Sequence, residues 1–100
     1  MIKHIVCWTL KGNAEGRTKA ENAVVMKNLL EGIKGIVPGM IHYEVGLNFN
    51  VSDAAFDVAL YSEFENRDAL DAYQVHPEHL RVVKELGKIR DKRIIADYEI

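Results

Sequence analysis

A single proline restricts the C-terminal half of this chain more than any other residue. Pro77 disfavours the α conformation at His76 but suits the first position of a new helix. Asn66 is a good N-cap for an earlier helix, whose apolar face includes Tyr73. The pattern predicts two helices that meet at a corner, with His79 in the first turn of the second helix. We expect the chemistry of the chain at this bend, because one phenol and two imidazoles gather there.

Strand and helix patterns alternate through the chain. Segments rich in β-branched and aromatic residues predict strands at 2–10, 40–47, 56–64 and 93–99. Thr18 followed by Glu21 matches a capping box, which predicts a helix that begins there and ends near Gly35. The order β-α-β-β-α-β is that of a ferredoxin-like α+β fold with one four-stranded antiparallel sheet. A chain of 100 residues makes one domain, so residues 1–100 are assigned to a single unit.

Alternation also assigns side chains to the core. The first strand is expected to turn one face inward, formed by Ile2, His4, Val6, Trp8 and Leu10. The corresponding face of the second strand consists of Ile41, Tyr43, Val45 and Leu47. The helix that follows Pro77 is expected to turn Leu80, Val83 and Leu86 inward.

The first and third strands are apolar on both faces, which bears on assembly. One long helix and one broken helix can cover only one face of a four-stranded sheet. The opposite face would carry Ile5, Cys7, Ala59 and Tyr61, an apolar patch that monomers rarely expose. We therefore expect a homodimer in which a second copy covers this face, with Ile5, Ala59 and Tyr61 at the contact.

Composition excludes several classes of partner. The formal charge of −2 gives no basic excess, so neither nucleic acid nor an anionic membrane is an expected partner. The lone Cys7 cannot form an internal disulfide, which favours a reducing, cytoplasmic location. Lys3 and His4 interrupt the short apolar start, so no signal peptide is expected. No stretch approaches the roughly 20 apolar residues that span a bilayer.

Five segments resemble a known family. They are IKHIV at 2–6, VPG at 37–39, EVGLN at 44–48, AYQVHPEH at 72–79 and ADY at 96–98. Together they are similar to the stress-responsive A/B barrel (Dabb) domain, and the Tyr-x-x-His-Pro-x-His corner is the most specific part. The resemblance implies a dimeric α+β barrel of two ferredoxin-like subunits, in a family whose members mostly have no assigned activity.

The resemblance also implies a candidate site. Plant members of the family include stress-induced oligomers and a cofactor-free polyketide cyclase. The active residues of that cyclase correspond by position to His4, Tyr73 and His79. This chain departs from the cyclase at Val58, where the cyclase has another pocket histidine, and it lacks an aromatic pair early in the first helix.

The chemistry of these three residues suits proton abstraction beside a carbonyl, followed by aldol-type closure. The positive end of the helix dipole disfavours an imidazolium at His79, and a neutral imidazole is what a general base needs. Tyr73 could donate a hydrogen bond to a developing enolate oxygen, and His4 could orient a substrate carbonyl. The expected pocket walls are Val6, Trp8, Val58 and Leu60. No phosphate loop or nucleotide fingerprint is present, so no cofactor is expected.

Several alternatives remain open at this point. Three histidines, His4, His76 and His79, could ligate a metal, but a turn explains His76 and no fourth ligand is evident, so no metal is expected. The basic cluster at 84–93 is interpreted as a solvated helix end. Three functions fit the sequence. The first is a cofactor-free cyclase or lyase with His79 as base. The second is a non-catalytic stress-responsive protein that binds a small molecule, and the third is an oligomeric structural protein.

Overall fold

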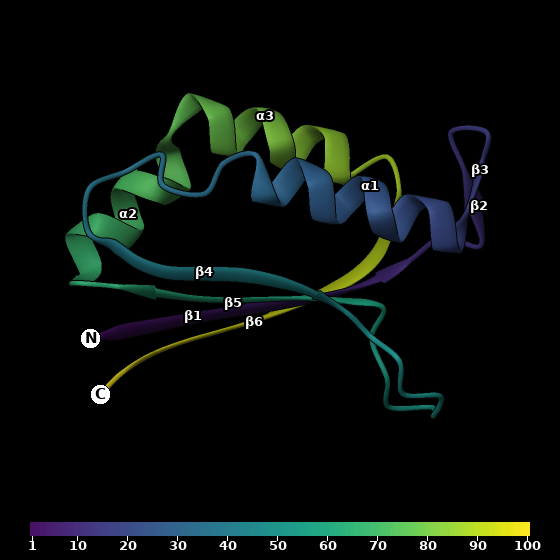
Figure 1. Cartoon of the computed structure of the whole chain (residues 1–100), viewed down its shortest axis with the longest axis horizontal. Helices are drawn as coiled ribbons and strands as arrows, with labels where there is room; N and C mark the ends of the chain where they lie inside the picture. The colour runs from purple at the N-terminus through teal and green to yellow at the C-terminus, as the bar shows by residue number, and fades with distance from the viewer.

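Four strands form one antiparallel sheet, and all three helices lie on one of its two faces (Figure 1). The computed structural model describes residues 1–100. Its elements are β1 (Ile2–Leu10), β2 (Asn13–Ala14), β3 (Arg17–Thr18), α1 (Lys19–Glu31), β4 (Met40–Leu47), β5 (Val58–Phe64), α2 (Arg67–Val75), α3 (Pro77–Leu86) and β6 (Arg90–Glu99). The sheet order β4-β5-β1-β6 places β1 beside both β5 and β6. The predicted ferredoxin-like fold is confirmed, with β5 starting two residues later and β6 three residues earlier than expected.

The corner at Pro77 forms as predicted. Asn66 caps α2 by accepting a hydrogen bond from the backbone N–H of Ala69. His76 then ends α2 and caps α3, because its extended backbone breaks the helix and its Nδ1 accepts from the N–H of Glu78. Pro77 occupies the first turn of α3, where its missing N–H costs nothing.

Helix α1 begins at the predicted capping box but ends earlier than predicted. Thr18 accepts from the N–H of Glu21, whose carboxylate accepts from the N–H of Thr18. The helix stops at Glu31, and the chain continues in tight turns as far as Gly35, which has φ +79°. Those turns still bury Ile33, so the predicted apolar stripe continues beyond the C-terminal end of α1.

A short hairpin of β2 and β3 joins β1 to α1 and was not predicted. Glu15 and Gly16 form its turn with φ +52° and +72°, a conformation typical of two-residue hairpin turns. The fully buried Asn22 of α1 holds the hairpin in place. Its Nδ2 donates to the carbonyl oxygen of Ala14 at 3.0 Å, and its Oδ1 accepts from Nε of Arg17 at 2.7 Å. Strands of two residues leave no alternation to detect, which explains the omission.

Three residues expected in the core are exposed. Ile41 is 50% exposed because the β4–β5 register shifts between Met40 and His42 and rotates it out of the inward face. Leu47 stays on the inward face but lies at the end of β4. Helix α3 leaves Leu80 exposed and buries Val82 in addition to the predicted Leu86, while Val83 is half-buried and lines the cavity described below.

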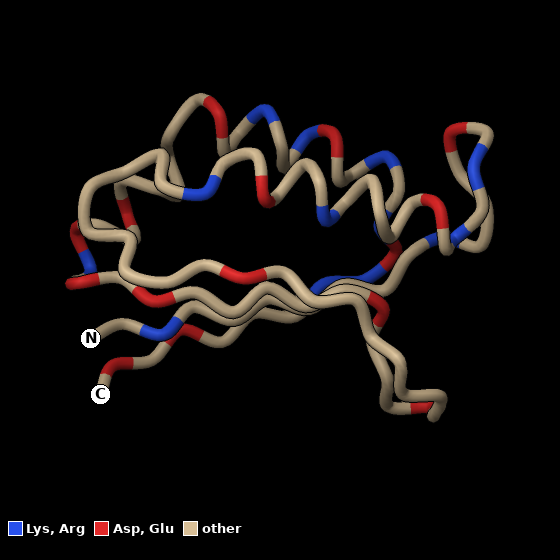
Figure 2. Tube along the Cα trace, viewed as in Figure 1, with Lys and Arg blue, Asp and Glu red and all other residues tan.

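Two further observations concern the helices. Acidic and basic residues are interspersed along the outer surface of the helices (Figure 2). No helix is both long enough and apolar enough to span a membrane.

Candidate functional site

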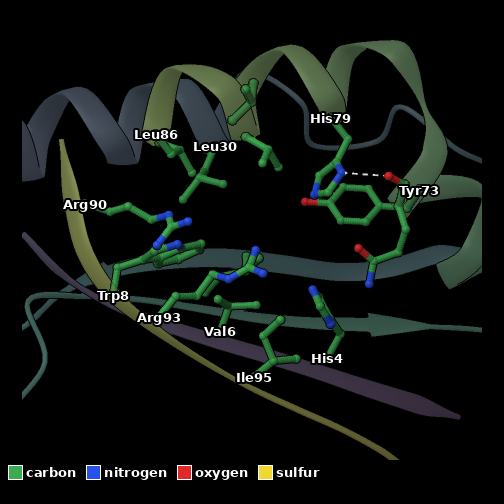
Figure 3. Close-up of a pocket in the computed structure, with 14 residues that line it drawn as sticks. His4, Val6, Trp8, Leu30, Tyr73, His79, Leu86, Arg90, Arg93 and Ile95 are labelled. Carbon is green, nitrogen blue, oxygen red and sulfur yellow. Dashed lines mark hydrogen bonds between the residues drawn. The ribbon is translucent and has the colours of Figure 1, made fainter. Parts of the chain in front are cut away.

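A cavity lies between α3 and the sheet, mainly over β1 and β6 (Figure 3). Six of the seven predicted site residues line it: His4, Val6, Trp8, Leu60, Tyr73 and His79. The other lining residues are Leu30, Gln74, Val82, Val83, Leu86, Arg90, Arg93 and Ile95. The space that water can occupy is about 30 Å³, enough for roughly two water molecules.

Val58 was expected in the pocket wall and is not part of it. Its side chain is fully buried in the hydrophobic core. It pairs with Trp8 from the β5 side of β1, whereas the cavity opens toward β6 on the other side. The strand pattern predicted its inward face correctly but could not say over which strands the cavity would lie.

His79 is the third residue of α3 and is half-buried. Its Nδ1 lies 3.0 Å from the backbone oxygen of Gln74. A carbonyl oxygen can only accept, so Nδ1 carries the proton and Nε2 of the neutral ring keeps its lone pair. Burial lowers the pKa of His79 below its ordinary value, and the hydrogen bond to Gln74 partly opposes that effect. His79 is therefore held as a neutral base near neutral pH.

Tyr73 comes from α2 and lies against the His79 ring, with 4.4 Å between the ring centroids. Figure 3 shows its phenol oxygen directed into the cavity beside that ring. The hydroxyl is 3.1 Å from the hydroxyl of Tyr43 on β4. Burial raises the pKa of Tyr73 to about 12, and the hydrogen bond from Tyr43 acts in the opposite direction. When the Tyr73 hydroxyl accepts a hydrogen bond from Tyr43, it can donate its own hydrogen to a ligand.

His4 is buried on β1, and its Nδ1 lies 2.5 Å from Oδ1 of Asp97 on β6. The carboxylate accepts, so Nδ1 of His4 carries a proton and Nε2 is the nitrogen that faces the cavity (Figure 3). The ring also meets Tyr73 edge-on at 6.2 Å between centroids, which joins all three predicted residues. Ser62 fixes the strand here by donating from Oγ to the backbone oxygen of His4 at 2.9 Å.

Asp97, Arg90 and Arg93 are site residues that the sequence analysis missed. Asp97 faces His4 because the two are directly paired across β1 and β6. That register joins residues 93 positions apart, and no local pattern reveals it. The interpretation of 84–93 as a solvated helix end was wrong for Arg90 and Arg93, which belong to β6 and line the cavity.

His76 and Cys7 lie outside the site. His76 is occupied by the cap of α3, so it is not placed to join His4 and His79. No group of three His, Cys, Asp or Glu side chains is arranged to hold a metal ion. Cys7 alternates with His4 along β1 and so faces the other side of the sheet, and partial burial raises the pKa of its thiol.

The comparisons with known proteins agree on the fold. The model of the family described as the stress responsive A/B barrel domain matches residues 2–100. An Arabidopsis thaliana protein, stress-response A/B barrel domain-containing protein DABB1, is 27% identical over 98% of this chain, which spans only 46% of that longer protein. A dimeric Bacteroides fragilis protein of unknown function with a ferredoxin-like fold is 35% identical, with a TM-score of 0.79 over 99% of this chain and 95% of its own.

One solved structure of similar shape is an enzyme. The hydroxynitrile lyase of Passiflora edulis has a TM-score of 0.81 over 99% of this chain and 92% of its own. It is only 18% identical, so this likeness shows the fold alone. The family model covers almost the whole chain, and the fold and the corner agree with it. The chain belongs to the stress responsive A/B barrel domain (Dabb) family.

Proposed function

We propose that this Dabb domain binds a small, largely apolar carbonyl compound in the cavity and removes a proton beside the carbonyl, with His79 as general base. One observation carries the proposal. His4, Tyr73 and His79 come from three different elements and meet in one mostly apolar cavity. An apolar cavity with a few convergent polar groups is the usual form of a small-molecule site.

The proposed step uses only side chains of this chain. Nε2 of neutral His79 takes a proton from the carbon next to the carbonyl. The electrons of the broken C–H bond form the C=C bond of an enolate, and the carbonyl π electrons move to oxygen. Tyr73 donates a hydrogen bond to that oxygen while it accepts one from Tyr43. Attack of the enolate carbon on a second carbonyl closes a ring, and the imidazolium of His79 returns its proton to the alkoxide oxygen that forms. Without a second carbonyl the imidazolium returns a proton to the enolate carbon, which exchanges that proton with solvent.

The geometry favours this function over the two alternatives. A structural oligomer has no need for a cavity that reaches exposed residues such as Arg93 and Ile95. A simple binding protein has no need for a phenol stacked on an imidazole whose tautomer is fixed by Gln74. The free space is about 30 Å³, so a ligand of more than a few atoms must displace side chains that line the cavity.

Hydrogen exchange beside carbonyl groups tests the step without knowledge of the natural substrate. A panel of small ketones and oxo acids is incubated with the protein in D₂O, and proton NMR follows the loss of α-protons. We expect at least one compound to exchange faster with wild type than with His79→Ala, by about 10²–10⁴. Tyr73→Phe should lower the rate less, because it removes one hydrogen bond and keeps the ring.

His76→Asn is the matched control. It removes a neighbouring imidazole but keeps a good N-cap for α3, so its exchange rates should equal those of wild type. Equal rates for wild type and His79→Ala with every compound would leave non-catalytic binding of a small molecule as the better description.

We also propose that the chain forms a homodimer through the sheet face opposite the helices. In the isolated chain Ile94 and Tyr98 are exposed on this face, and Ile5 and Tyr61 are only partly buried. The dimeric relative from Bacteroides fragilis supports the same assembly here. The interface should exceed the ~1,000 Å² expected of a biological contact. A monomer mass by light scattering at micromolar concentration would contradict it.

A further inference from the structure

Two arginines enter the cavity from β6. Arg93 pairs with Trp8 and Arg90 pairs with Leu10 across the β1–β6 ladder, on either side of a register shift. Directly opposed residues of neighbouring strands project to the same face, and Trp8 and Leu10 are buried beneath the helices. Both guanidinium groups therefore project toward the helical side, into the space below α3 (Figure 3).

Neither of these arginines has a partner in the chain. Their side chains take part in no ion pair and no hydrogen bond. Each of the three other arginines does have one: Arg17 with Asn22, Arg67 with Glu99 and Arg81 with Glu78. Figure 2 shows the basic stretch at the start of β6 beneath the helices. Arg90 is half-buried and Arg93 is exposed, and both line the cavity, so their guanidinium groups are free to pair with an anion that enters it.

The cavity thus has two chemically different ends. His4, Tyr73 and His79 lie at one end and Arg90 lies with Trp8 at the other, while the guanidinium of Arg93 lies between Arg90 and His4 (Figure 3). Aliphatic side chains, among them Val82 and Leu86, form much of the rest of the lining. A ligand that contacts both ends carries a carbonyl group at the histidine end and an anionic group at the arginine end, with apolar atoms between them.

We propose that Arg90 and Arg93 bind the carboxylate of the ligand, so that the substrate class is an oxo acid. This inference rests on the proposed function, because it places the carbonyl of that acid beside His79. The planar guanidinium donors match the two oxygens of a carboxylate, which gives the pair its preference for that group. The single charge and flat shape of a carboxylate suit the narrow cavity better than a bulkier phosphate.

Binding would also act on the base. Burial is the largest cause of the lowered pKa of His79, and the positive charge of Arg93 is a smaller one. A bound carboxylate offsets the charge of Arg93, so it moves the pKa of His79 back toward its ordinary value. The proton affinity of His79 should therefore be higher with an oxo acid bound than with the neutral ester of that acid bound.

A binding experiment with matched probes tests the assignment. The probes are 4-oxopentanoate, 5-oxohexanoate and 6-oxoheptanoate, each compared with its neutral methyl ester. NMR titration of the ¹⁵N-labelled full chain gives the dissociation constants. We expect wild type to bind at least one acid more tightly than its ester, on the order of tenfold for two partly exposed charge contacts. Arg90→Gln and Arg93→Gln should each reduce that preference, and the double variant should abolish it without weakening ester binding.

Lys92→Gln is the matched control, because it removes the same charge from the same strand at a residue that does not line the cavity. It should keep the full preference for the acid. Thermal unfolding of each variant shows that the fold is retained. The proposal is wrong if no acid binds more tightly than its ester, or if the preference survives in the double variant. An oxophosphonate of equal length that binds more tightly than the acid would also overturn it, in favour of a phosphate-type group.

The two proposals can fail separately. Arginine-dependent binding of an oxo acid whose α-protons exchange equally with wild type and His79→Ala would uphold the carboxylate site and refute the general base. Exchange that depends on His79 but proceeds equally well with acids and esters would uphold the base and refute the carboxylate site.

Discussion

The hydroxyls of Tyr43 and Tyr73 offer the sharpest test of the energetics of the site. They lie 3.1 Å apart, and each is the only hydrogen-bond partner of the other. Tyr43 is 2% exposed, so its hydroxyl has no access to solvent, whereas Tyr73 lines the cavity. The loss in the free energy of unfolding should therefore depend on which of the two hydroxyls is removed.

The structure sets the expected order of the free energies of unfolding. Tyr73→Phe leaves the buried hydroxyl of Tyr43 unpaired, which costs about 1–3 kcal/mol. Tyr43→Phe leaves the hydroxyl of Tyr73 free to bind water in the cavity, so its cost should be at most about 1 kcal/mol. The double variant removes both hydroxyls and leaves nothing unpaired, so it should be more stable than Tyr73→Phe alone.

Urea and thermal unfolding of the four proteins measure this cycle. Each kcal/mol corresponds to roughly 4–8 °C in a domain of this size. Protein concentration is held constant, because dimer stability depends on it. Additive losses in the double variant, or a larger loss for Tyr43→Phe than for Tyr73→Phe, would refute the reasoning.

Two further predictions concern pH and backbone strain. Because the pKa of His79 is lower in the folded chain than its ordinary value of about 6.5, the unfolded chain binds more protons as the pH falls. Stability should therefore decrease from about pH 7 down through the folded pKa, and His79→Gln should flatten that slope in pH-dependent urea unfolding; an unchanged slope would contradict the assignment. Gly39 has φ +87°, and a Cβ added there would lie 2.9 Å from Cβ of Ala69. Gly39→Ala should destabilise the fold more than Gly35→Ala, which has φ +79° but open space and should cost about 1–2 kcal/mol for its backbone alone; equal losses in urea unfolding would show that the contact with Ala69 relaxes freely.

The features that the sequence predicted correctly depend on neighbouring residues. Pro77 acts on His76 through local steric contacts, and Thr18 and Glu21 exchange hydrogen bonds across three positions. The inward face of β1 follows from alternation within one strand. These interactions are complete within a few residues, so they can be recognised before the chain is folded.

The composition of the site depended on tertiary structure. The β1–β6 register brings Asp97 to His4 and the two arginines to the cavity, and that pairing joins opposite ends of the chain. The phase of α3, with Val82 inward, is set by how the helix lies on the sheet rather than by its own apolar residues, which fit two phases. Val58 likewise does not line the cavity, because the cavity opens toward β6 and Val58 lies on β5.

The sequence by itself determined the order of the elements, the corner and the gathering of Tyr73 and His79, because short-range sterics and hydrogen bonds control them. Only the tertiary structure decided which nitrogen of each imidazole is hydrogen-bonded and which charges lie at the cavity. Those properties arise from the carbonyl of Gln74, the carboxylate of Asp97 and the guanidinium of Arg93. The positions of Asp97 and Arg93 follow from strand pairing across the whole chain, and that of Gln74 from the angle at the corner.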